Sequence, residues 1–157
     1  MRVLGVSGTY HDAAAALLAG TAALEHAPSW PREAIDEVFA IPADIGRDDL
    51  LKGVSHVARR RRIDRVVPLD DFDVETAALL REHLRVPGMG ETTARYFRDK
   101  LAMRVRARDH DVLVPPFVGL FNDEAVNAFL DTVPGPWLVK PRSQAAAIGI
   151  RKALNRD

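Results

Sequence analysis

The residues best suited to chemistry lie near the end of the chain, where an apolar strand ends on a cation. The segment Trp137-Leu138-Val139-Lys140-Pro141-Arg142 runs into Ser143-Gln144, three alanines and Ile148-Gly149-Ile150. Lys140 supplies a compact positive charge, Arg142 supplies a second one, and small side chains let backbone N–H groups approach phosphoryl oxygens. This pattern indicates a phosphate-binding loop. A surface hairpin with solvated basic residues fits the same spacing, so spacing alone leaves both interpretations open.

A second lysine, Lys100, follows Asp99 at the start of a predicted helix, after the glycine-bracketed loop Pro87-Gly88-Met89-Gly90. Several motifs now stand in order along the chain, and together they resemble the ATP-grasp superfamily. They are Val86-Pro87-Gly88-Met89-Gly90, Thr92-Thr93, Phe97-Arg98-Asp99-Lys100-Leu101-Ala102-Met103-Arg104, Val114-Pro115 and Leu138-Val139-Lys140-Pro141-Arg142.

The resemblance implies a set of ATP-binding residues. In that family the Asp-Lys pair of the helix and the lysine of the strand reach the ATP phosphates from two flanking lobes. Lys100 and Lys140 match these positions, and we expect them to hold the α- and β-phosphates. Arg142, Ser143 and Ile148-Gly149 match the loop that covers the triphosphate, although this loop has fewer glycines than the biotin-carboxylase type and carries three alanines.

The resemblance also implies Mg²⁺ as a second cofactor, with its Glu and Asn ligands and the adenine-reading strand placed beyond Asp157. The chain would then be the front portion of a ligase, as a truncated, frameshifted or partial product. Phosphoryl transfer depends on metal ions to neutralise charge between the phosphates. We therefore do not expect this portion to be catalytic alone, and the sequence identifies no catalytic residue and no metal ligand within it.

The implied reaction of the whole enzyme is phosphorylation of a carboxylate by ATP, followed by attack of an amine or another nucleophile on the acyl phosphate. The partners are then ATP and an unidentified carboxylate. A noncatalytic nucleotide-binding module is an alternative. The opening Leu4 to Leu17 also resembles the carbamoyltransferases that modify antibiotics and nodulation factors. This resemblance would place His11 at an active site. The alternative is that His11 is a residue of a loop or of the first turn of a helix, without a catalytic role.

Other polar clusters have simpler interpretations. The arginines Arg59 to Arg62 close a predicted helix, where cations favour the dipole, and no aromatic residues are interleaved for base stacking. Asp70, Asp71 and Asp73 follow a strand end, where Asp73 is predicted to cap a helix. The five histidines have no metal-ligand spacing, so we do not expect a zinc site.

The elements that must position these residues alternate between strand and helix, which predicts an α/β fold with a small parallel, Rossmann-like sheet over residues 1–86. The resemblance implies that this is the pre-ATP-grasp domain. We predict a strand at Arg2 to Ser7, a helix carrying Ala13 to Leu18, a helix from Asp48, a strand at Ile63 to Leu69 and a helix after Asp73. The segment Glu33 to Ile41 fits a helix or a strand equally. Val66 to Asp73 looks like the last strand and turn of the domain that precedes the grasp.

For residues 87–157 the resemblance implies the N-terminal subdomain of a truncated ATP-grasp domain. Its expected elements are a nearly continuous helix over Thr92 to His110, a helix capped by Asn122, a strand at Pro136 to Lys140, and an antiparallel return at Ile148 to Lys152.

The composition limits the possible partners and compartments. The 157 residues are 47% hydrophobic and 28% charged, which is the balance of a globular domain. Lys and Arg number 22 against 22 Asp and Glu, so no net field attracts nucleic acid or an anionic membrane, and we expect neither as a partner. There is no cysteine, which excludes thiolate chemistry and fits a reducing compartment such as the cytoplasm.

Overall fold

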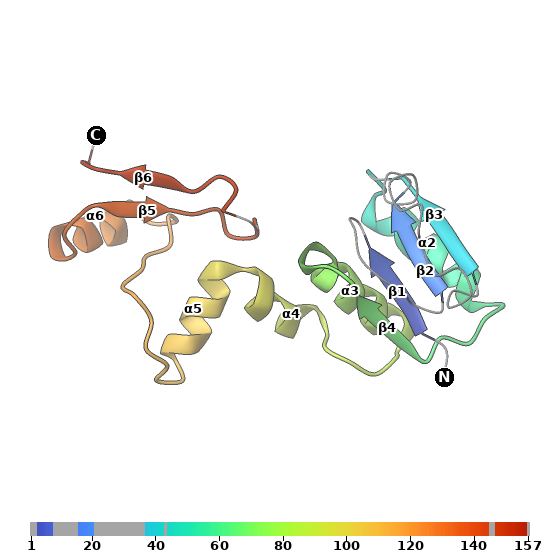
Figure 1. Cartoon of the computed structure of the whole chain (residues 1–157). Coiled ribbons are helices and arrows are strands. Elements are labelled where there is room, and N and C mark those ends of the chain that lie inside the picture. The colour runs from blue at the N-terminus through green and yellow to red at the C-terminus, as the bar shows by residue number, and fades with distance from the viewer. Residues whose placement is uncertain (1–2, 8–15, 21–36, 43, 145–146, 157) are drawn as a thin grey trace. The chain divides into compact units, whose positions relative to one another are not determined.

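The structure is a computed structural model that describes residues 3–7, 16–20, 37–42, 44–144 and 147–156 (Figure 1). The chain divides into two compact units, Met1–Ala94 and Arg95–Asp157. No helix in the described part of the chain is long and apolar enough to cross a membrane.

The first unit contains a four-stranded parallel sheet. Its strands are β1 (Val3–Ser7), β2 (Ala16–Gly20), β3 (Glu37–Ile41) and β4 (Arg65–Pro68), in the order β3-β2-β1-β4. The chain thus builds outward from β1 to β3 and then returns to the other side of β1, as in the first half of a doubly wound fold. The predicted parallel sheet is confirmed.

One of the predicted elements in this sheet was wrong. Ala16, Leu17 and Leu18 lie in strand β2, between β1 and β3, and not in a helix. A short run of alanine and leucine has no periodicity that separates helix from strand, so pairing on both sides decided its structure. The segment left open between helix and strand contains β3, which pairs in parallel with β2.

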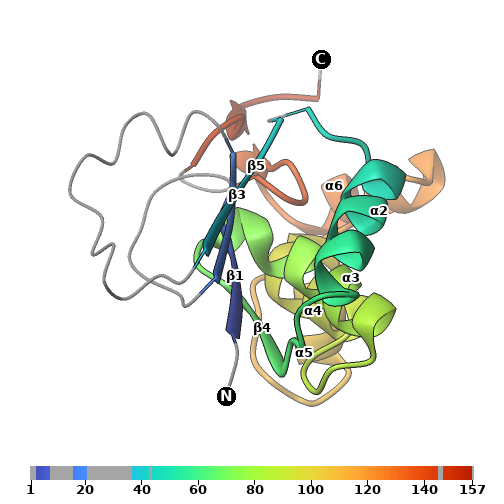
Figure 2. The ribbon, with the colours of Figure 1, turned by 90° about the vertical axis from the view of Figure 1, so that its right-hand side faces the viewer.

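Two helices cover one face of the sheet, α2 (Arg47–Ala58) and α3 (Val74–Leu84), as Figure 2 shows. The predicted helix from Asp48 is confirmed, with Asp48 and Asp49 in the first turn of α2. The core of the unit lies where these helices meet β4, and its buried side chains are Leu50, Val54, Val66, Ala77 and Leu80.

The turn after β4 is a short 3-10 helix, η2 (Asp71–Asp73), that leads into α3. Asp70 caps η2, because its side chain accepts a hydrogen bond from the Phe72 N–H at 2.8 Å. Asp73 precedes α3 as predicted, but its side chain makes no capping bond to that helix. The predicted side-chain cap at Asp73 is therefore wrong, because Asp73 already has helical backbone angles, with φ −89° and ψ −6°. The capping side chain of this turn is Asp70, which caps η2.

The remaining elements are α4 (Glu91–Arg98), α5 (Lys100–Arg108), α6 (Asp123–Thr132) and a two-stranded antiparallel sheet of β5 (Trp137–Val139) and β6 (Arg151–Ala153). The predicted α6 cap is confirmed, since the Asn122 side chain accepts from the Ala125 N–H at 2.9 Å. The predicted antiparallel return is also confirmed, with β6 starting at Arg151.

The helical stretch predicted over Thr92 to His110 is interrupted at one residue. Asp99 takes an extended backbone conformation, with φ −89° and ψ 110°, and separates α4 from α5. The apolar spacing continues across the break, so periodicity alone does not reveal it. Asp99, the residue at this break, belongs to the candidate site.

Candidate phosphate-binding site

Asp99 anchors the start of α5. Its Oδ1 accepts hydrogen bonds from the backbone N–H groups of Leu101 at 2.9 Å and Ala102 at 3.2 Å. These N–H groups have no partner within the helix, so the carboxylate satisfies them and also favours the positive end of the helix dipole. The cap fixes where α5 begins, and Lys100 is its first residue.

Asp99 also binds Arg142, which comes from the loop after β5. Arg142 Nε donates to Asp99 Oδ1 at 3.0 Å, and Arg142 Nη2 donates to Oδ2. Asp99 is buried with 6% of its surface exposed, whereas the side chain of Arg142 is half exposed. The hydrogen bond from Arg142 lowers the pKa of Asp99, against the opposing effect of burial. Arg142 further lies 5.4 Å from the ring centroid of Phe121.

The backbone of the same loop is fastened to the junction of α4 and α5. Lys100 N–H donates to the carbonyl of Arg142 at 2.9 Å, and Arg98 Nη2 donates to the carbonyl of Ser143 at 2.7 Å. Lys100 Nζ donates to the carbonyl of Gln144. The predicted site residues Lys100, Arg142 and Ser143 thus lie together, although more than forty residues separate the first from the other two.

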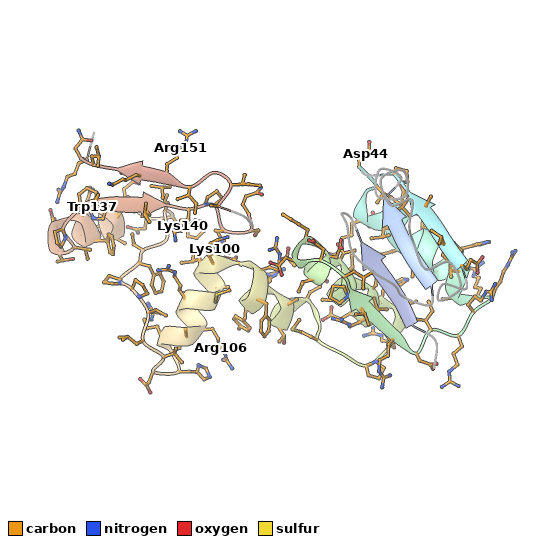
Figure 3. All side chains as sticks on the ribbon, in the orientation of Figure 1. Asp44, Lys100, Arg106, Trp137, Lys140 and Arg151 are labelled. Atoms are coloured by element: carbon orange, nitrogen blue, oxygen red, sulfur yellow. The ribbon has the colours of Figure 1, made fainter. Side chains whose placement is uncertain are left out.

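Lys140 lies two residues before Arg142, directly after β5. Because the Arg142 carbonyl accepts from Lys100 N–H, the Cα atoms of the two lysines are at most roughly 14 Å apart. Figure 3 labels both residues, at the first turn of α5 and after β5. Lys140 is exposed, and it forms no hydrogen bond or ion pair within the part of the chain that the structure describes.

Gly149 closes the loop for a conformational reason. Its φ is +72°, a region that favours glycine, and a Cβ at this position would lie 2.8 Å from Cγ of the Pro141 ring. Ala147 also has a positive φ of 60°. The loop therefore turns sharply between the two strands, and at residue 149 only glycine fits without displacing the proline.

Sequence reasoning missed the structural roles of Asp99 and Arg98. These are the buried charged side chains of the Arg95–Asp157 unit, in which no described apolar side chain is fully buried. An aspartate before a helical run is an ordinary capping signal, so the cap could have been predicted. The pairing with Arg142 spans 43 residues, and no local pattern indicates it.

His11 lies outside the described residues, so the carbamoyltransferase interpretation stays a prediction. Among the described residues, no three acidic or histidine side chains come together in a way that could hold a metal ion.

Comparison with known proteins gives the fold its context. The structure resembles the crystal structure of an L-amino acid ligase from Bacillus licheniformis, with a TM-score of 0.74 over 99% of this chain and 17% sequence identity. The chain shares the fold of part of that ligase. It spans 40% of the length of that ligase. No protein-family model matches the sequence, and no curated protein matches it.

Proposed function

We propose that this chain binds ATP as the front part of an ATP-grasp ligase, with Lys100 and Lys140 on the α- and β-phosphates. The observation that carries the proposal is the hydrogen bond between Lys100 N–H and the Arg142 carbonyl, which joins the start of α5 to the segment that follows β5 and carries Lys140. The fold shared with an L-amino acid ligase supports it. In this assignment residues 1–86 are the pre-ATP-grasp domain and residues 87–157 the N-terminal ATP-grasp subdomain.

Lys100 and Lys140 are able to meet a phosphate. The ammonium of Lys100 donates to the carbonyl of Gln144, a neutral acceptor, and a charged phosphoryl oxygen forms the stronger hydrogen bond. Lys140 is exposed, and no described residue competes for it. Both lysines have long flexible stems, so their ammonium groups can converge on one triphosphate.

The loop residues complete the proposed phosphate site. Arg142 uses two of its five N–H donors on Asp99, which leaves the others for a phosphate. Ser143, the next residue in the chain, is exposed and contributes a hydroxyl. Gly149 adopts a positive φ of 72°, and a side chain at this position would clash with Pro141.

The described residues would hold magnesium only indirectly, through the phosphates of a bound nucleotide. The described residues offer cations for the phosphates and no cluster of three metal ligands. When bound, Mg²⁺ neutralises charge between the phosphates and polarises the γ-phosphoryl group. We place its protein ligands outside the described residues, and the residues named above bind and orient the triphosphate. The reaction of the complete enzyme would activate a carboxylate as an acyl phosphate for attack by an amine or another nucleophile.

Calorimetric titration of ATP, with and without magnesium, tests the proposal. The titrated proteins are the wild-type chain, Lys100→Ala, Lys140→Ala and a control, Arg106→Ala. Arg106 is an exposed cation on the same helix as Lys100, and its guanidinium lies 5.4 Å from the Tyr96 ring centroid (Figure 3). Circular dichroism establishes that all variants are folded.

We expect ATP affinity to fall at least about tenfold in each lysine variant, because each loses a charge-assisted contact to phosphate worth roughly 1.5–3 kcal/mol. Arg106→Ala should bind as the wild type does. Equal losses in all variants would mean that general charge, and not this site, attracts the nucleotide. A folded wild-type chain that binds no ATP would overturn the proposal.

A further inference from the structure

A hollow of about 350 Å³ lies beside α2 and α3 of the first unit, and none of the residues assigned to ATP lines it. Its lining residues are Leu51, Lys52, Ser55, His56, Arg59 and His83. All but Leu51 carry an N–H or O–H donor, and none is a carboxylate. Such a lining suits a negatively charged ligand.

The wall of the hollow is partly fixed in place. Ser55 Oγ and His83 Nε2 are 2.7 Å apart, and Ser55 Oγ also donates to the Leu51 carbonyl at 2.7 Å. A hydroxyl has one hydrogen, so when it is directed to Leu51 the ring nitrogen of His83 is the donor to Oγ. This contact joins α3 to α2 and holds the imidazole at the edge of the hollow.

The arginine run at the end of α2 divides by the partners of its members. Arg61 pairs with Glu37 at 2.8 Å, and Arg62 pairs with Asp64 at 2.9 Å. The side chains of Arg59 and Arg60 make no hydrogen bond or ion pair with any described residue. Only Arg59 of these four lines the hollow. The dipole at a helix end accounts for cations in general, but not for this arrangement.

Lys52 is the second permanent cation of the hollow. It pairs with Asp49 at 2.8 Å, and both side chains are highly exposed, at 76% and 70%. An exposed pair of this kind contributes little net free energy, so a multiply charged anion can compete with Asp49 for the ammonium. Lys52 and Arg59 then offer two charges from one face of α2, opposite His83 of α3.

We propose that this hollow binds a phosphate-type anion through Lys52 of α2 and Arg59 at the end of α2, with His83 of α3 forming part of its wall. The ligand class is a free or ester-linked phosphate group, because its several acceptor oxygens match the Lys52 ammonium, the Arg59 guanidinium and a ring N–H of His56, all on α2 or at its end. This site is independent of the proposed ATP site, which lies in the other unit of the chain.

An NMR titration of the full chain tests the proposal with inorganic pyrophosphate as the probe, at constant ionic strength. The readouts are the imidazole signals of His56 and His83 and the backbone amide of Ser55. Arg59→Ala is compared with Arg60→Ala, which removes the same charge from the neighbouring residue without touching the hollow. ADP is titrated separately to distinguish a nucleotide from a free phosphate ion. Lys140→Ala, titrated in the same way, separates these signals from binding at the proposed ATP site.

We expect saturable shifts at these three residues with a dissociation constant in the millimolar range. Arg59→Ala should weaken binding about three- to fivefold, the effect of one exposed charge pair, and neither Arg60→Ala nor Lys140→Ala should change it. Tighter binding of ADP would identify a nucleotide as the ligand, and equal binding a free phosphate ion. The absence of saturable shifts, or equal weakening in Arg59→Ala and Arg60→Ala, would overturn the proposal.

Discussion

The polar cluster of the Arg95–Asp157 unit consists of Arg98, Asp99, Lys100, Arg142 and Ser143. Replacing Asp99 by alanine should destabilise this unit more than any other single substitution in the cluster. The substitution removes the acceptor that caps the N–H groups of Leu101 and Ala102, and it removes the partner of Arg142. No described apolar side chain of this unit is fully buried, so the cluster contributes a large share of the fixed structure.

The magnitude follows from the two contributions. Loss of a helix N-cap costs about 1 kcal/mol. The ion pair contributes about 0.5 kcal/mol, because half of the Arg142 side chain is exposed and solvent screens the charge. Arg142 can rehydrate after the change, so no penalty for a buried unpaired charge is added. Asp99→Ala should therefore cost about 1.5 kcal/mol and lower the melting temperature by roughly 6–12 °C.

Asp99→Asn is the matched control. Asparagine caps a helix about as well as aspartate, so this variant loses only the ion pair and should cost about 0.5 kcal/mol. Thermal unfolding followed by Trp137 fluorescence measures both variants, in a Trp30→Phe background that leaves one tryptophan. Trp137 reports on the unit because its Nε1 donates to the Val133 carbonyl at 2.9 Å.

Equal losses of stability in the alanine and asparagine variants would refute the reasoning, because they would show that the cap contributes nothing. An unchanged melting temperature in Asp99→Ala would refute it more completely, since neither contact would then stabilise the folded unit.

Three further predictions concern the same contacts and the core. Because the folded pKa of Asp99 is lowered, its ion pair stabilises the protein above the unfolded pKa of about 3.9 and loses this effect as the pH falls through the folded pKa. The stability advantage of wild type over Asp99→Asn, measured by urea unfolding, should therefore be constant from pH 7 to 5 and disappear at lower pH; an advantage that persists at pH 2 would contradict this. Gly149→Ala should cost about 1–2 kcal/mol in Trp137-monitored unfolding, owing to its φ of +72° and the clash with Pro141, whereas Ala147→Gly should not destabilise the unit. Leu80→Ala should cost about 3 kcal/mol in unfolding followed by circular dichroism, because Leu80 is fully buried in the core of the first unit; a cost below about 1 kcal/mol would contradict that packing.

The sequence predicted those elements whose signals are local. The helix beginning near Asp48 has an acidic first turn and apolar residues at helical spacing, and α6 has an asparagine cap, so both could be located. The β-branched run of β4 between polar loops also predicts a strand. The alanine- and leucine-rich β2 could not be assigned correctly, because its structure depends on strands β1 and β3 on either side.

The sequence proposes members of the candidate site but not their arrangement. Lys100 and Lys140 stay predictions from ordered motifs that resemble a family, and the structure brings together the segments that carry them. The ion pair of Asp99 with Arg142 and the hydrogen bond from Arg98 to the Ser143 carbonyl each join residues more than forty positions apart. Such contacts form only in the folded backbone, and neither the amino-acid composition nor the hydrophobic periodicity of the sequence indicates them.

The proposed function requires that this part of the chain hold ATP by its phosphates through Lys100 and Lys140. The most direct test is competition against bound ATP by tripolyphosphate and by adenosine, each titrated into the folded wild-type chain. Tripolyphosphate should displace ATP at concentrations close to those of ATP itself, and adenosine should displace it poorly or not at all. Displacement by adenosine with no effect of tripolyphosphate would contradict the account, because the base and not the phosphates would then provide the binding.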